Sequence, residues 1–173
     1  NNLFCDLLEE NAGAYPKYQM EYGDWLNFRI PDTDENILIF ASGRGSNAEA
    51  IYKATIEDKI NGVVVGVICD HKEAFVIKRA SMWKVPVTII EKKNFVNKMD
   101  FDEALVVAAK SYTPDLICLA GYMRICGADL IHEFPNKIIN IHPALLPSFR
   151  GLHAQRQALE AGVKVAGCTV HFV

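Results

Sequence analysis

The sequence has no apolar run long enough to span a membrane, and no secretory leader is visible in it. It also lacks an excess of positive charge, because 18 lysines and arginines stand against 21 aspartates and glutamates, for a formal net charge of −3. Bulk electrostatics therefore gives no support to a nucleic acid or an anionic membrane as a partner. We expect a cytoplasmic protein without either partner, present as a monomer or a homodimer.

The chain also lacks the residue spacings of disulfide-rich and metal-binding proteins. Its five cysteines are an odd number and include no CxxC pair. Cys69 and Cys118 lie inside apolar runs, so we expect them to be buried and reduced. No two histidines share a metal-ligand spacing with a third ligand, so no metal is predicted.

The 173 residues are half hydrophobic, which is enough for one compact domain with a core. Residues 1–35 combine scattered glycines and prolines with aromatic residues, and we expect an N-terminal extension of unknown role. The pattern becomes regular in residues 36–173, where the main domain is predicted.

Apolar runs alternate with segments of helical spacing through residues 36–173. Strands are expected at 37–41, 63–69, 85–90, 115–120, 137–141 and 167–173, and helices at 46–59, 72–83, 100–112, 128–133 and 153–161. Most of the strands are apolar on both faces, which is typical of a buried parallel sheet. The prediction is a Rossmann-like α/β fold, with a mainly parallel sheet and helices on both faces. Ligands of such sheets bind outside the carboxyl ends of the strands.

A glycine-rich loop, Ser42-Gly43-Arg44-Gly45-Ser46-Asn47, joins the first expected strand to the first helix. Glycine lets a backbone turn tightly, and a helix start offers free N–H groups to an anion. Ser46 and Glu49 also have the spacing of a capping box. The loop is therefore either a capped turn without a ligand or a phosphate cradle made by Gly45, Ser46 and Asn47.

The same loop fits the dinucleotide fingerprint, with Gly43, Gly45 and Ala48 in G-x-G-x-x-A form. Asp70 ends the second expected strand, where an acid could bind a ribose. A nicotinamide-dependent oxidoreductase is thus an alternative that this loop does not exclude.

Asn140 and His142 stand two residues apart at the end of the fifth expected strand. Side chains at i and i+2 point the same way on a strand, so both project together at the ligand edge. They could simply satisfy backbone groups of the loop. An amide donor beside an imidazole could instead stabilise an oxyanion and transfer a proton.

The segment Asn-Ile-His-Pro-Ala-Leu-Leu-Pro-Ser-Phe-Arg-Gly at 140–151 resembles the signature of the formyltetrahydrofolate-utilising formyltransferases. Four further pieces agree with this family in the same order, at 41–47, 119–125, 151–153 with 156–160, and 169–173. Within the family, the sequence is most similar to enzymes that act on glycinamide ribonucleotide. The resemblance implies a one-carbon transferase of de novo purine biosynthesis, with 10-formyltetrahydrofolate as co-substrate and no metal.

The resemblance also implies roles for individual residues. Asn140 and His142 would be catalytic, and His153 and His171 would support them. Gly45, Ser46 and Asn47 would bind the phosphate of the ribonucleotide. The folate would contact Lys98, Tyr122, Met123, Arg124, Cys126, Ile131 and Asn140. Arg124 would meet an acidic part of the folate.

Three positions depart from what the family implies. Lys98 replaces an arginine, and an ammonium cannot copy a bidentate guanidinium. Cys126 replaces a larger aliphatic residue. The family also has a catalytic aspartate a few residues beyond the strand that here ends at Val173. On that comparison the C-terminal part of the domain would be missing, and a protein that ended at Val173 would be inactive.

Other functions are compatible with parts of this sequence. A formyltetrahydrofolate hydrolase shares the Asn-x-His strand end but usually has an N-terminal regulatory domain, and Pro143 fits a transferase better. Methionyl-tRNA formyltransferase shares it too but would need a nucleic-acid-binding part. A non-catalytic binder of a phosphorylated ligand is a further alternative.

Overall fold

The computed structural model describes residues 35–173, so the predicted N-terminal extension falls outside the described residues except for Glu35. The described chain forms two compact units, residues 35–139 with 172–173 and residues 140–171. The strands are β1 (Glu35–Ala41), β2 (Gly62–Cys69), β3 (Val87–Ile89), β4 (Leu116–Leu119), β5 (Ile138–His142) and β6 (Thr169–Phe172). The helices are α2 (Ser46–Ile56), α3 (Phe75–Trp83), the 3-10 turn η1 (Lys92–Asn94), α4 (Lys98–Ser111), α5 (Ala128–Glu133) and α6 (Ala154–Glu160).

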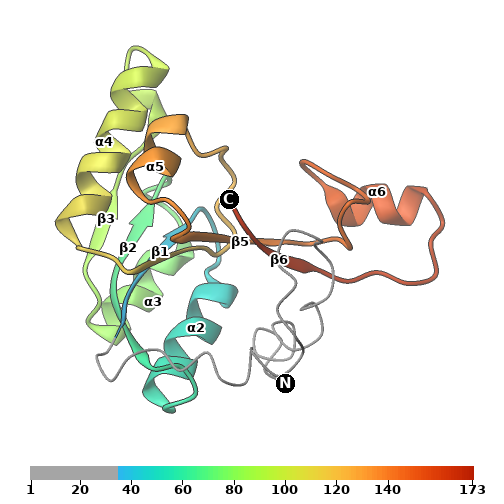
Figure 1. Cartoon of the computed structure of the whole chain (residues 1–173), viewed down its shortest axis with the longest axis horizontal. Helices are drawn as coiled ribbons and strands as arrows, with labels where there is room; N and C mark the ends of the chain where they lie inside the picture. The colour runs from blue at the N-terminus through green and yellow to red at the C-terminus, as the bar shows by residue number, and fades with distance from the viewer. Residues whose placement is uncertain (1–34) are drawn as a thin grey trace. The chain divides into compact units, whose positions relative to one another are not determined.

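The strands form one six-stranded sheet in the order β3-β2-β1-β4-β5-β6. Figure 1 shows β1, β2 and β3 with the helices α2, α3 and α4 around them. β1 pairs in parallel with both β2 and β4, and β2 pairs in parallel with β3. The predicted α/β fold with a mainly parallel sheet is confirmed. From β1 the chain continues through β2 to β3 at one edge of the sheet, and it then returns to β4 on the other side of β1. The switch point between β1 and β4 is where α/β sheets of this kind bind their ligands.

The core lies against β1, because this strand is apolar on both faces. Residues Ile37 to Ala41 are at most 2% exposed. Leu38 and Phe40 belong to a cluster with apolar residues of α4 and α5, among them Leu105 and Leu130. Helices α2 and α3 contact β2 and each other, and their buried residues are small or branched. Burial on both faces explains the unbroken apolar run of the strand. The predicted burial of Cys69 and Cys118 is confirmed.

Some predicted element boundaries are wrong, and local chemistry explains them. β3 is shorter than the expected 85–90, because Pro86 has no N–H for the ladder and offers only its carbonyl, to Val67 N at 2.9 Å. α3 begins three residues late, after a turn in which Ala74 N donates to the His71 carbonyl. α4 begins two residues early, because the Asn97 side chain accepts from Asp100 N at 2.8 Å and caps it.

Gly66 of β2 lies directly under the ring of Tyr112, which follows α4. A Cβ at Gly66 would overlap the ring, and the Tyr112 hydroxyl is held 2.7 Å from Thr88 Oγ1 of β3. We expect Gly66→Ala to lower the free energy of unfolding by about 1–3 kcal/mol, the usual cost of overpacking. Urea unfolding measures the change. Adding Tyr112→Leu should recover part of the loss, and a double variant as unstable as the sum of the two single ones would contradict the packing explanation.

Candidate active site

The glycine loop joins β1 to α2 as predicted, but the predicted capping box is wrong. Gly45 is the N-cap of α2, with φ 74° and ψ 29°, and no side chain caps the helix. Glu49 N donates to the Gly45 carbonyl at 2.9 Å, and the Glu49 carboxylate pairs with Arg79 instead of returning to Ser46. The first amides of α2 therefore stay available for an anion at the positive end of the helix.

Helix α3 holds the glycine loop from the other side. Val76 N donates to the Gly43 carbonyl at 3.1 Å, and Arg79 Nε donates to the Arg44 carbonyl at 3.0 Å. Because the same Arg79 also pairs with Glu49 of α2, one guanidinium ties the loop to both helices. The shape of the loop is thus fixed before any ligand arrives.

Gly45 is the position of this loop that tolerates least change. Its φ is positive, and a Cβ there would lie 2.5 Å from Val76 Cγ2. If the loop binds a phosphate, Gly45→Ala should raise the KM of the phosphorylated substrate roughly tenfold, because backbone strain and the clash each cost on the order of 1 kcal/mol. Steady-state kinetics measures it. Gly43→Ala is the matched control, since nothing lies within 4 Å of a Cβ at Gly43, and an equal effect of both variants would contradict the argument.

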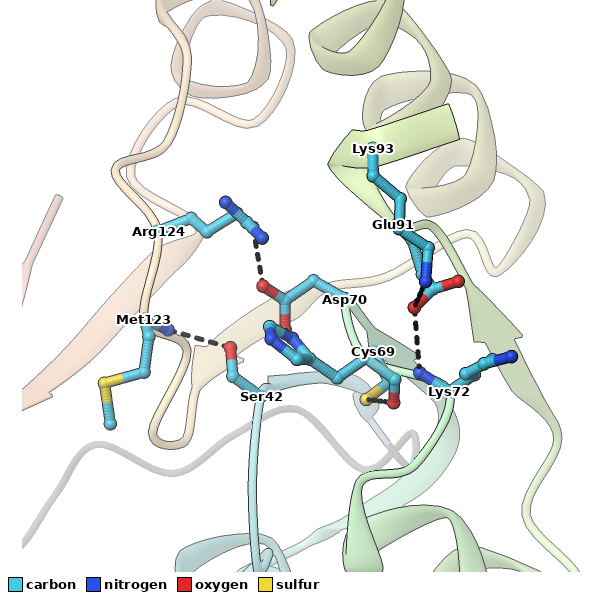
Figure 2. A network of polar contacts seen from close by, with 9 residues as sticks. Ser42, Cys69, Asp70, Lys72, Glu91, Lys93, Met123 and Arg124 are labelled. Atoms are coloured by element: carbon cyan, nitrogen blue, oxygen red, sulfur yellow. Dashed lines mark hydrogen bonds and ion pairs between the residues drawn. The ribbon is translucent and has the colours of Figure 1, made fainter. Parts of the chain in front are cut away.

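A second loop, residues 121–126, follows β4 and is tied to the ends of β1 and β2. Ser42 N donates to the Gly121 carbonyl at 3.2 Å, and Met123 N donates to Ser42 Oγ at 2.9 Å. Arg124 Nε lies 2.6 Å from Asp70 Oδ2, as Figure 2 shows. Ser42 belongs to the glycine loop, so its two hydrogen bonds join the two loops.

Asp70 is the centre of this polar network. Its side chain is only 1% exposed, and His71 Nδ1 lies 2.9 Å from its Oδ1. Burial by itself would raise the pKa of Asp70, but hydrogen bonds from Ser42 and His71 and the charges of His71 and Arg124 outweigh it, so the pKa is lowered. Because this carboxylate is buried and paired with Arg124, it is not exposed to a ribose diol, and it gives no support to a nicotinamide-dependent enzyme.

The sequence suggested Asp70 only as a ribose-binding acid and missed its pairing with Arg124. A parallel sheet brings the ends of neighbouring strands to one edge, and β2 and β4 both flank β1. An acid just after β2 and an arginine after β4 are therefore candidates for an ion pair.

The remaining residues of the predicted folate set in this unit lie near α4 and α5. Tyr122 is buried and packs edge-on against Phe40, with 5.3 Å between ring centroids, and its hydroxyl has no hydrogen-bond partner among residues 35–173. Burial raises the pKa of the Cys126 thiol to about 11, so it is protonated at neutral pH. Cys126 and Ile131 pack against the core. Lys98, the first residue of α4, forms an ion pair with Asp102.

In the second unit, Asn140 and His142 line one cavity of about 430 Å³. Leu146, Pro147, Arg150, Gly151 and His171 line the rest of it. Arg150 was not among the predicted site residues. Arg150 is a charged residue in the loop that follows the Asn-x-His strand, and this position could have predicted it as a site residue.

Hydrogen bonds orient both polar side chains. Asn140 Nδ2 lies 3.2 Å from His171 Nε2, and His142 Nε2 lies 2.9 Å from the Phe149 carbonyl oxygen. A carbonyl only accepts, so His142 Nε2 carries the hydrogen in this arrangement, and Nδ1 is the atom that can accept or release a proton. The amide of Asn140 has a second N–H besides the one directed at His171.

A buried threonine fixes the loop after β5. Thr169 Oγ1 donates to the Ala144 carbonyl at 2.8 Å and accepts from Leu146 N at 3.0 Å. The two bonds use both the donor and an acceptor site of one hydroxyl, so the wall of the cavity near Leu146 is held by β6.

The structure thus gathers the predicted site residues into two sets. Asn140 and His142 share the cavity of residues 140–171, whereas the glycine loop, the 121–126 loop, Lys98 and Ile131 belong to the other unit.

Comparison with known proteins decides the family. Residues 35–173 match the model described as "Formyl transferase". The chain belongs to the formyl transferase family. The resemblance found in the sequence is therefore confirmed, and the family is one of enzymes.

Individual relatives agree with this assignment. The phosphoribosylglycinamide formyltransferase of Bacillus subtilis (strain 168) is 45% identical over 139 residues, which are 80% of this chain and 71% of that protein. The human trifunctional purine biosynthetic protein adenosine-3 is 36% identical over 147 residues, or 85% of this chain and 15% of that protein. The crystal structure of glycinamide ribonucleotide transformylase 1 from Symbiobacterium toebii superposes with a TM-score of 0.79 at 46% identity, covering 81% of this chain and 66% of that one.

Proposed function

We propose that this formyltransferase family member transfers the formyl group of 10-formyltetrahydrofolate to the amine of glycinamide ribonucleotide, in de novo purine biosynthesis. The observation that carries the proposal is that Asn140 and His142 line one cavity, with an amide N–H and an imidazole Nδ1 available there. The Bacillus subtilis relative supports the choice of acceptor, since its name specifies phosphoribosylglycinamide.

The chemistry needs an oxyanion site and one proton transfer. The amine nitrogen bonds to the formyl carbon, and the carbonyl oxygen becomes an oxyanion. The second N–H of Asn140 donates to that oxygen, and His142, protonated at Nδ1, stabilises the same charge. As the bond from carbon to the folate nitrogen breaks, His142 gives its Nδ1 proton to that nitrogen, and the neutral imidazole then takes up the proton that the amine loses.

The glycine loop supplies the site for the phosphate of the ribonucleotide. Gly45, Ser46 and Asn47 stand at the start of α2, which has no side-chain cap. A dianionic phosphate is stabilised there by the free amides and by the helix dipole. This part of the site gives binding and orientation and performs no bond chemistry.

The folate co-substrate is assigned to Lys98, Tyr122, Met123, Arg124, Cys126, Ile131 and Asn140. Arg124, whose side chain is 31% exposed, is the group assigned to an acidic part of the folate.

The enzyme is proposed to act in the cytoplasm without a metal, a nucleic acid or a membrane, as a monomer or a homodimer. Residues 35–173 contain no group of three or more histidines, cysteines or acids that could hold a metal ion. No helix among the described residues has the length and apolar content to cross a bilayer.

A transfer assay tests the function directly. The full-length protein is mixed with glycinamide ribonucleotide and 10-formyl-dideazafolate, and deformylation is followed by absorbance. Deformylation that requires the ribonucleotide is expected. Equal deformylation without it would indicate a hydrolase, and saturable micromolar binding of NADH without binding of the folate analogue would favour the oxidoreductase alternative.

A further inference from the structure

The ion pair between Arg124 and Asp70 joins two residues of very different exposure. The Asp70 side chain is 1% exposed and that of Arg124 is 31% exposed, and Arg124 Nε lies 2.6 Å from Asp70 Oδ2. The buried carboxylate cannot turn away into solvent, so it fixes the guanidinium at the end of β2 (Figure 2). The ring of Phe101, 5.9 Å from the guanidinium carbon, contacts the same group.

The pair also changes the charge that the 121–126 loop offers to a ligand. Asp70 keeps its negative charge at neutral pH, because its contacts with Ser42, His71 and Arg124 lower its pKa in spite of burial. Lys98 is likewise paired with Asp102. Both cations assigned to the folate are therefore offset by a carboxylate of this chain. A ligand carboxylate must compete with Asp70 for Arg124 or bind its remaining N–H groups at reduced net charge.

We propose that Asp70 is a positioning residue for Arg124 and that its negative charge limits the preference of the site for folates that carry a glutamate carboxylate. The inference rests on the proposed function, since it takes a folate as the ligand of this loop. It assigns to Asp70 a role in substrate selection, in place of the ribose contact that the sequence suggested.

Asp70→Asn tests the proposal, because an asparagine oxygen can still accept from Arg124 Nε while the charge is gone. The dissociation constants of 10-formyl-dideazafolate and of the same compound without its glutamate are measured by calorimetry. The ratio is the dissociation constant of the compound without glutamate divided by that of the compound with glutamate. In Asp70→Asn this ratio should be roughly fivefold larger than in the wild type, which is the usual size of one partly exposed charge interaction. The compound without glutamate should bind within about twofold of its wild-type constant.

Two further comparisons distinguish an effect of Asp70 through Arg124 from a general effect of its charge on the ligand. In an Arg124→Gln background, adding Asp70→Asn should leave the ratio unchanged, because the cation that it releases is absent. Glu91→Gln is the matched control, since Glu91 lies at the same sheet edge but accepts from Lys72 and Lys93 instead of Arg124. Its ratio should equal that of the wild type.

The possible results divide clearly. An unchanged ratio in Asp70→Asn, an equal weakening of both ligands, or the same rise without Arg124 would each overturn the role of Asp70 and leave the proposed function standing. A wild-type protein that binds neither compound would overturn the proposed function and this inference with it.

Discussion

Replacing His142 by alanine is expected to lower kcat by a factor on the order of 10²–10³, the usual effect of removing one group that stabilises an oxyanion. The imidazole lines the cavity with Asn140, and its Nε2 is held by the Phe149 carbonyl, so Nδ1 is the atom that serves the reaction. The variant should retain its affinity for the ribonucleotide phosphate, because the glycine loop does not include His142. Transfer assays at saturating concentrations of both substrates measure the loss.

His132→Ala is the control for this variant. His132 lies exposed on α5, outside the proposed site, and its replacement should leave kcat within about twofold, as expected for a surface substitution. Calorimetry with the ribonucleotide checks that His142→Ala is folded and still binds. A His142→Ala protein that binds and turns over at the wild-type rate would remove the imidazole from the mechanism.

The sequence predicted the fold well, because the fold depends on repeated patterns. The apolar run of β1 is buried on both faces by helices, and alternation of such runs with helical spacing specifies a parallel sheet. Errors fell at element ends, where single residues decide. Pro86 shortens β3 and the Asn97 side chain lengthens α4, and neither effect is visible in hydrophobic spacing.

The sequence predicted the part of the candidate site that follows from residue spacing within one segment, and it missed the contact between distant segments. Asn140 and His142 are i and i+2 on a strand, so their shared cavity followed from strand geometry. The Asp70–Arg124 pair joins residues 54 apart in the chain, and it depends on the order of strands in the sheet, which a single sequence does not specify. The capping box failed for a local reason. Gly45 can take the positive φ that begins α2, which moves Ser46 into the helix.

Replacing Asn140 by aspartate should cost more than replacing it by alanine. Both changes remove the N–H donor of the oxyanion, which costs a factor on the order of 10²–10³ in kcat. The aspartate adds a negative charge of nearly the same shape beside the oxygen on which charge develops, so its loss should exceed that of Asn140→Ala. Transfer assays on the two variants give the comparison, with Asn94→Ala, at an exposed asparagine of η1, as the control.

The double variant Asn140→Ala/His142→Ala tests whether the two side chains act on the same oxygen. If both side chains stabilise the same oxygen, the second replacement lowers kcat by a smaller factor than the same replacement does in the wild type. The combined loss in kcat then falls below the product of the two single losses. Independent roles, such as phosphate binding for one and proton transfer for the other, predict a full product instead. Because both residues line one cavity at the end of β5, we expect the smaller loss. A full product would assign Asn140 and His142 to different steps.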